Sequence, residues 1–263
     1  MPHHQDTDEP DVVEVIGAPV EGSALILCEH ASHHIPARYH GLGLSASARQ
    51  SHAAWDPGAR AVALHLARAL HAPLVAARLS RLVYDCNRPP DAASAMPERT
   101  EVIEVPGNHG LSAAERAARA AAVYAPFCAA VGQVIAARKA AGRATALITI
   151  HSFTPVWFGT ARSCEIGILH DSDTRLADAM LAEAHRLPHR VIRRNDPYGP
   201  EDGVTHSLKI HGLAQGLPNV MIEIRNDLLH GASAEAHLAE EVLTLLRPAL
   251  DALEQTTGGG THA

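Results

Sequence analysis

The sequence predicts a single α/β domain of three layers, in which helices cover both faces of a mostly parallel, mixed central sheet. Short apolar runs bounded by turn residues alternate with longer alanine-rich stretches that have helical spacing. No linker and no internal repeat interrupts this alternation. The chain has 263 residues, a length that suits one large globular domain.

The predicted elements follow one another in a regular order. Buried strands are expected at five apolar runs: 24–28, 73–77, 144–150, 165–169 and 219–224. Helices are expected at four alanine-rich stretches: 56–71, 112–141, 173–186 and 234–253. The ends, 1–20 and 255–263, are rich in Asp, Pro, Gly and Thr and are expected to be flexible tails around a catalytic domain at 21–254. Sheets of this kind place their sites at the carboxyl ends of strands.

Composition narrows the classes of partner. The chain has 29 acidic and 22 basic residues and a net charge of −7, so it lacks the basic field that binds nucleic acid or anionic lipid. Its most apolar stretch, 59–79, is interrupted by charged side chains and does not suit a membrane span. The acidic N-terminus does not resemble a signal peptide, and the four cysteines form no C-x-x-C motif. We expect a cytoplasmic protein with neither a nucleic-acid nor a membrane partner, and its oligomeric state stays open.

Histidine is unusually frequent, with 19 in the chain, and two of these stand where predicted strands end. The first strand is followed by Glu29 and His30, and the apolar run 144–150 ends at His151, which Ser152 follows. Side chains from neighbouring strand ends converge, and neutral imidazoles are good zinc ligands. The pattern therefore predicts a metal site formed by His30 and His151.

The third ligand stays open from the residues alone. Asp56 stands directly before Pro57 at a predicted helix start, a position typical of a helix N-cap and equally accessible to a metal. His33 and His52 are the alternatives, since both lie close in sequence to the first ligand or to Asp56.

Two further kinds of side chain point to hydrolysis of a carboxylate-bearing substrate. Glu223 interrupts an apolar strand, where burial would raise its pKa toward the range of a general base. Asn87 and Arg88 follow another apolar run, and the arginine offers the planar donor fork that binds a carboxylate. Arg162 and Arg225 are further candidates for this binding role.

Several of these strings together resemble the zinc carboxypeptidase superfamily. Its second zinc histidine resembles His151 with the Ser and Phe that follow, its D-x-N-R segment resembles 85–88, and its glutamate strand resembles 222–227. Within that superfamily, the N-formylglutamate amidohydrolase family is most similar, over residues 24–246. The similarity runs through the segments EHAS (29–32), HAAWDPGA (52–59), SRLVYDCNRP (80–89), PGN (106–108), HSFTP (151–155), NDPY (195–198) and IEIRND (222–227).

The resemblance implies a zinc carboxypeptidase-like fold and one Zn²⁺ per chain. The carboxypeptidases carry a compact H-x-x-E, but here His33 stands three residues after His30, so we expect Asp56 to replace the missing Glu. The expected ligands are then His30, Asp56 and His151, with the fourth position left for water.

The other roles follow from the same resemblance. Glu223 is expected to be the general base, and Asn87 with Arg88 is expected to hold the substrate carboxylate. We expect Glu29 and Ser152 to lie behind the metal ligands, with Glu29 hydrogen-bonded to a ligand histidine.

The expected reaction is hydrolysis of a linear amide by metal-activated water. The substrate would be an N-acyl amino acid with a carboxylate, such as N-formylglutamate. The chain has the sequence EHAS at 29–32 where well-known members have roughly PHSG. The resemblance alone therefore does not assign the substrate of those members to this chain. The alternatives are a hydrolase for another N-acyl amino acid or a short peptide, and a non-catalytic protein that binds a metal or a small acid.

Overall fold

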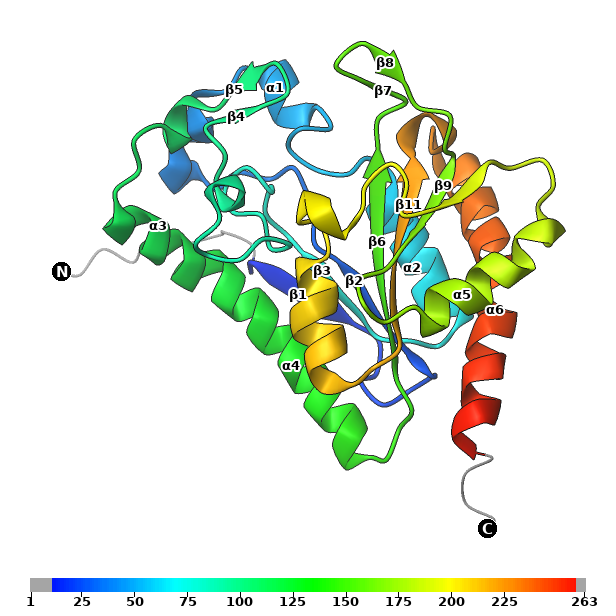
Figure 1. Ribbon diagram of the computed structural model, residues 1–263. Coiled ribbons are helices and arrows are strands. Elements are labelled where there is room, and N and C mark those ends of the chain that lie inside the picture. The colour runs from blue at the N-terminus through cyan, green and yellow to red at the C-terminus, as the bar shows by residue number, and fades with distance from the viewer. Residues whose placement is uncertain (1–10, 259–263) are drawn as a thin grey trace.

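A computed structural model describes residues 11–258 (Figure 1). Its centre is a seven-stranded sheet with the order β1-β3-β2-β6-β11-β9-β10. The strands are β1 (Val13–Ile16), β2 (Ala24–Cys28), β3 (Leu74–Ala77), β6 (Ala146–Phe153), β9 (Ile166–Leu169), β10 (Ile192–Arg194) and β11 (Asn219–Arg225).

The four inner strands β3, β2, β6 and β11 run parallel, whereas β1 and β9 run antiparallel to their neighbours β3 and β11. The outermost strand β10 is parallel to β9. This arrangement confirms the predicted mixed, mostly parallel sheet. The carboxyl ends of the inner strands therefore meet at one edge of the sheet.

Helices cover both faces of the sheet, as predicted (Figure 1). One face packs against α2 (Ala59–Ala69), α5 (Arg175–Ala182) and α6 (Ala232–Gly258), through side chains such as Ile148 and Ile150 of β6. The other face packs against α4 (Ala125–Ala140) and the π-helical turn η7 (Leu208–Gly212), through side chains such as Leu147. Alternation along β6 supplies both cores, because successive strand residues point to opposite faces.

The stretch predicted as one helix at 112–141 is continuous but changes pitch. Ser112 caps α3 (Ala113–Arg119), then a π-helical turn, η4 (Ala120–Tyr124), leads into α4. Among the described residues, 113–140 is the one helical stretch long and apolar enough to cross a membrane by length and composition. Here Phe127 and Val131 are buried in the core beside the sheet, an arrangement that the same composition also suits.

Two small hairpins rise at one end of the molecule, upward in Figure 1. They are β4 (Arg99–Thr100) with β5 (Ile103–Glu104), and β7 (Val156–Trp157) with β8 (Thr160–Ala161). Since β7 follows β6, this is the end at which the inner strands finish. The remaining elements are short helices: η1 (Ala37–Gly43), α1 (Ala46–Gln50), η2 (Ala93–Ala95), η3 (Pro106–Asn108), η5 (Glu183–Arg186), η6 (Pro200–Asp202), η8 (Leu213–Gln215) and η9 (Asn226–Leu228).

The boundaries of the expected tails need correction. Residues 13–16, placed in the tail 1–20, form strand β1 along the edge of the sheet. Strand β1 is short and partly exposed, so its sequence lacks the apolar run that marks an inner strand. At the other end, α6 continues to Gly258, beyond the expected domain end at 254. The rest of the two expected tails, 1–10 and 259–263, lies outside the described residues.

Candidate active site

Four predicted residues meet at the carboxyl edge of the inner strands. His30 lies two residues after β2, and Asp56 lies in the turn that leads into α2. His151 and Glu223 lie in β6 and β11 and stand opposite each other in the parallel register. Because β2, β6 and β11 are adjacent, residues far apart in the sequence are brought into one cluster.

Three donor atoms converge at this edge. The Nδ1 atoms of His30 and His151 lie 3.2 Å apart, and Asp56 Oδ2 lies 3.2 Å from the first and 2.9 Å from the second. Ligand atoms about 2.0–2.2 Å from a tetrahedral Zn²⁺ are separated by about 3.3–3.6 Å. The three buried side chains could therefore hold a metal ion with little rearrangement.

The other ring nitrogen of each histidine faces a carboxylate. His30 Nε2 lies 2.7 Å from Asp85 Oδ1, and His151 Nε2 lies 3.2 Å from Glu29 Oε2. A carboxylate accepts but cannot donate, so the hydrogen bond to Asp85 favours a proton on His30 Nε2 and leaves His30 Nδ1 free for a metal. Glu29 places a negative charge beside His151 without forming a hydrogen bond to it.

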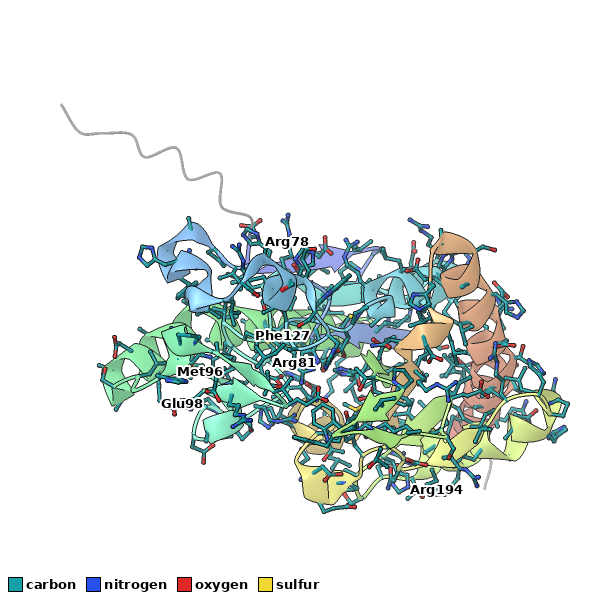
Figure 2. The ribbon with its side chains drawn as sticks, turned by 90° about the horizontal axis from the view of Figure 1, so that it is seen from above. Arg78, Arg81, Met96, Glu98, Phe127 and Arg194 are labelled. Atoms are coloured by element: carbon teal, nitrogen blue, oxygen red, sulfur yellow. The ribbon has the colours of Figure 1, made fainter. Side chains whose placement is uncertain are left out.

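The charges of the cluster are unbalanced. Glu29, Asp56 and Asp85 are each at most 3% exposed, and one guanidinium pairs with two of these three carboxylates. Arg81 lies 3.1 Å from Asp56 Oδ1 and 3.2 Å from Asp85 Oδ2. In the view from above, Arg81 lies near the middle of the molecule (Figure 2). With neutral imidazoles the cluster carries two negative charges, which a divalent cation would neutralise.

The pKa values report the charges that surround each group. Burial raises the pKa of Asp85, but His30 and Arg81 outweigh it and hold that pKa well below its usual range. Burial lowers the pKa of His151, but the Glu29 and Asp56 carboxylates outweigh it and raise that pKa well above its usual value. A site that attracts a proton so strongly also attracts a metal cation.

Glu223 differs from the other three carboxylates because, among residues 11–258, it takes part in no ion pair. Its side chain is 5% exposed, and burial raises its pKa to about 7. Its Oε2 atom has no hydrogen-bond partner among the described residues. A carboxyl group in this state can accept a proton and release it again near neutral pH.

A cavity of about 350 Å³ opens beside the cluster and is lined by His30, Asp56, His151 and Glu223. The β4–β5 hairpin contributes residues 99–101 to its wall, and β7 contributes Trp157. The cavity therefore lies at the edge where a sheet of this kind is expected to bind its ligand.

Comparison with known proteins identifies the family. A family model described as N-formylglutamate amidohydrolase matches residues 22–249. The chain belongs to the N-formylglutamate amidohydrolase family. This confirms the resemblance found in the sequence, and it makes the protein a member of a family of amide-bond hydrolases.

Solved structures of similar fold include a gene product of Agrobacterium tumefaciens, with 55% identity and a TM-score of 0.91 over 93% of this chain and 97% of that one. An N-formylglutamate amidohydrolase from Ralstonia eutropha has 20% identity and a TM-score of 0.62 over 95% of this chain and all of that one. A more distant match is a metallo-carboxypeptidase from Burkholderia cenocepacia, with 12% identity and a TM-score of 0.41 over 93% and 62% of the two chains. A search of curated proteins finds no match.

Two predicted carboxylate-binding residues of this amidohydrolase lie on the cavity wall, but they differ in what they can bind. Arg88 donates from Nη1 to the Asn87 carbonyl oxygen at 2.9 Å, and among residues 11–258 it takes part in no ion pair. The Asn87 amide donates to the Val204 carbonyl at 2.5 Å and accepts from the Ser207 amide at 2.9 Å. Asn87 therefore holds the 204–207 segment in place while it lines the cavity, and its contact with substrate stays a prediction.

The two further candidates for carboxylate binding, Arg162 and Arg225, form hydrogen bonds within the protein. Arg162 donates from Nη1 to the Tyr198 hydroxyl at 3.0 Å. Arg225 donates to Asp227 at 2.8 Å and to the Arg162 carbonyl at 3.1 Å. Neither arginine is among the residues that line the cavity, and their role as substrate ligands stays a prediction.

The alternative metal ligands lie apart from the donor cluster. His33 is exposed and packs edge-on against Trp55, with 5.1 Å between ring centroids. His52 lines the cavity, but its Nε2 faces Glu101 at 3.1 Å. Of the three residues left open by the sequence, only Asp56 joins His30 and His151.

Ser152 lies behind the cluster, where the sequence predicts it. Its backbone amide donates to Asp56 Oδ2 at 3.3 Å, and its hydroxyl donates to the Pro57 carbonyl at 2.8 Å. Both contacts fix the turn that presents Asp56. Ser152 therefore positions the Asp56 carboxylate, and it also forms part of the cavity lining.

Sequence reasoning missed two members of the cluster, Asp85 and Arg81. Asp85 opens the D-C-N-R string, which drew attention only to its last two residues. An aspartate that precedes those residues and follows an apolar run is a signal that could have indicated it. Arg81 carries no such signal, because its role depends on reaching two carboxylates from different segments.

Proposed function

We propose that this amidohydrolase is a zinc enzyme that cleaves the N-acyl amide bond of an N-acyl amino acid. The first substrates to test are N-formyl amino acids such as N-formylglutamate. The observation that carries this proposal is the convergence of three donor atoms beside the unpartnered Glu223, on the wall of one cavity. The cytoplasmic location and the lack of nucleic-acid and membrane partners stay predictions from composition.

His30, Asp56 and His151 would hold the zinc. When bound there, the metal would act as a Lewis acid on the amide carbonyl and lower the pKa of a water molecule. Asp85 keeps the His30 imidazole in the required tautomer, Glu29 places a negative charge beside His151, and Arg81 fixes the orientation of Asp56.

Glu223 is proposed as the general base. Its free Oε2 atom can accept a hydrogen bond from the attacking water and take its proton. The same carboxyl group then gives that proton to the leaving amine nitrogen, which allows the C–N bond to break. Burial near the cluster keeps the group ready for both transfers, since its pKa is raised to about 7.

The proposal is tested by purifying the protein, measuring zinc per chain by elemental analysis and assaying that preparation. The substrates are N-formyl, N-acetyl and N-succinyl amino acids together with dipeptides. We expect about one zinc per chain and hydrolysis of the N-formyl compounds. Absence of bound metal together with no hydrolysis of any N-acyl compound would favour a non-catalytic binding protein instead.

Replacing Arg88 with Lys tests the proposed carboxylate contact. A planar fork becomes a point charge, so kcat/KM for an N-formyl amino acid should fall by about tenfold, mostly through KM. Arg194→Lys is the matched control, because Arg194 pairs with Asp178 and lies toward the edge of the molecule in Figure 2. An unchanged KM in Arg88→Lys would remove Arg88 from the substrate site.

Replacing Asp85 with Asn tests the support of His30. The isosteric change removes the charge that faces His30 Nε2 and should weaken zinc binding by about 10–100-fold. The measurement is competition with a chromophoric chelator, with the exposed Asp91→Asn as the control. Equal zinc affinity in the two variants would contradict the role given to Asp85.

A further inference from the structure

One wall of the cavity is aromatic. The whole chain contains only two Trp, four Tyr and three Phe, and one of each lines this cavity: Trp157, Tyr198 and Phe153. In a chain with 3% aromatic residues, such a concentration at one site is a specific feature. The three aromatic residues lie at the end of β6, in the β7–β8 hairpin and in the loop after β10.

A single arginine fixes the three rings. The guanidinium carbon of Arg162 lies 4.8 Å from the centroid of the Tyr198 ring, 5.1 Å from that of Trp157 and 5.6 Å from that of Phe153. Arg162 also donates a hydrogen bond to the Tyr198 hydroxyl. Cation–π contacts of this kind hold rings in a fixed orientation. The wall is therefore preorganised, which reduces the entropic cost of stacking a ligand on it.

Most basic side chains that line the cavity are already paired with a carboxylate of the protein. Arg81 is paired with Asp56 and Asp85, Arg99 lies 3.4 Å from Glu104, and His52 faces Glu101. Arg88 is the one arginine of the cavity wall without a carboxylate partner among the described residues. Arg162 also forms no ion pair among residues 11–258, but it does not line the cavity, and its guanidinium is held by the three rings and the Tyr198 hydroxyl. One lining arginine without a carboxylate partner suits one substrate carboxylate, whereas N-formylglutamate carries two.

We infer that the preferred substrate is an N-formyl amino acid with an aromatic side chain, whose α-carboxylate contacts Arg88 and whose ring stacks on the wall of Trp157. This inference rests on the proposed function, because it assigns the substrate class of the same site. Glu101 adds a further negative charge to the cavity lining, with a side chain that is 18% exposed, which disfavours a second substrate carboxylate in the cavity.

The test compares binding with turnover. Binding of N-formyl-L-phenylalanine, N-formyl-L-alanine and N-formyl-L-glutamate is measured by calorimetry on zinc-loaded Glu223→Gln, and kcat/KM for the same compounds is measured on the wild-type enzyme. We expect the phenylalanine compound to bind more tightly, and to react with higher kcat/KM, than the glutamate compound by about tenfold or more.

The Trp157→Ala variant separates a stacking role from a merely structural one. It should lower kcat/KM for the phenylalanine compound by about tenfold and change that for the alanine compound by less than about threefold. Trp157→Phe should restore most of the loss. Val156→Ala, at a 48% exposed position of the same hairpin, is the control and should match the wild type.

The outcomes distinguish the two proposals. Equal or tighter binding of the glutamate compound, or an equal loss for all substrates in Trp157→Ala, would overturn the aromatic preference while leaving the hydrolase function intact. Aromatic preference in the binding measurement without turnover of any compound would support the inference and reject the hydrolytic function.

Discussion

The Glu223→Gln variant should keep its fold and its zinc but lose turnover, with kcat lower by about 10²–10⁴-fold. The amide has the shape of the carboxyl group, but it cannot take a proton from water or return one to the leaving amine. Position 223 faces no strong partner in the structure, so the exchange breaks no ion pair. Steady-state kinetics on N-formyl amino acids, together with zinc content and circular dichroism, measure all three properties.

A control separates loss of the base from a general change of charge. Glu240→Gln removes a carboxylate at an exposed position of α6 that does not line the cavity, and should have wild-type kcat. If Glu223→Gln retains more than about a tenth of the wild-type kcat, Glu223 is not the general base.

The second large effect is expected for Asp56→Asn, which should weaken zinc binding by more than about 100-fold and remove activity in proportion. Asp56 Oδ2 is the atom shared by both histidines, and the amide would replace the charge that balances a divalent cation there. Zinc per chain after dialysis against a chelator is the measurement.

His33→Ala serves as the comparison, because His33 was an alternative ligand and lies on the exposed surface against Trp55. This variant should keep about one zinc per chain. Loss of zinc from His33→Ala, with retention in Asp56→Asn, would show that the third ligand is misassigned.

Much of the fold could be predicted because inner strands carry a strong signal. The runs that became β2, β6 and β11 are apolar on both faces, since helices cover both sides of a parallel sheet. The edge strands β1 and β10 were missed for the converse reason. They are partly exposed, and Arg193 and Arg194 of β10 face solvent.

Some features of the site could likewise be predicted from the sequence, and others could not. His30, His151 and Glu223 could be placed together because strand ends meet at one edge, whatever lies between them in the sequence. The structural role of Asn87 could not be predicted, because the partners of its amide lie 117 and 120 residues away, in a segment that only folding brings near. Sequence indicates which residues arrive at an edge, but not which of their polar atoms are already occupied there.

Zinc titration tests the central claim most directly. Wild-type protein is stripped with a chelator, and the initial rate of hydrolysis of the best N-formyl substrate is followed as zinc is returned. The rate should start near zero, rise linearly and stop rising at one zinc per chain, and Asp56→Asn should show no such break. Full activity of the stripped protein, or the same titration curve in Asp56→Asn, would contradict a catalytic zinc held by His30, Asp56 and His151.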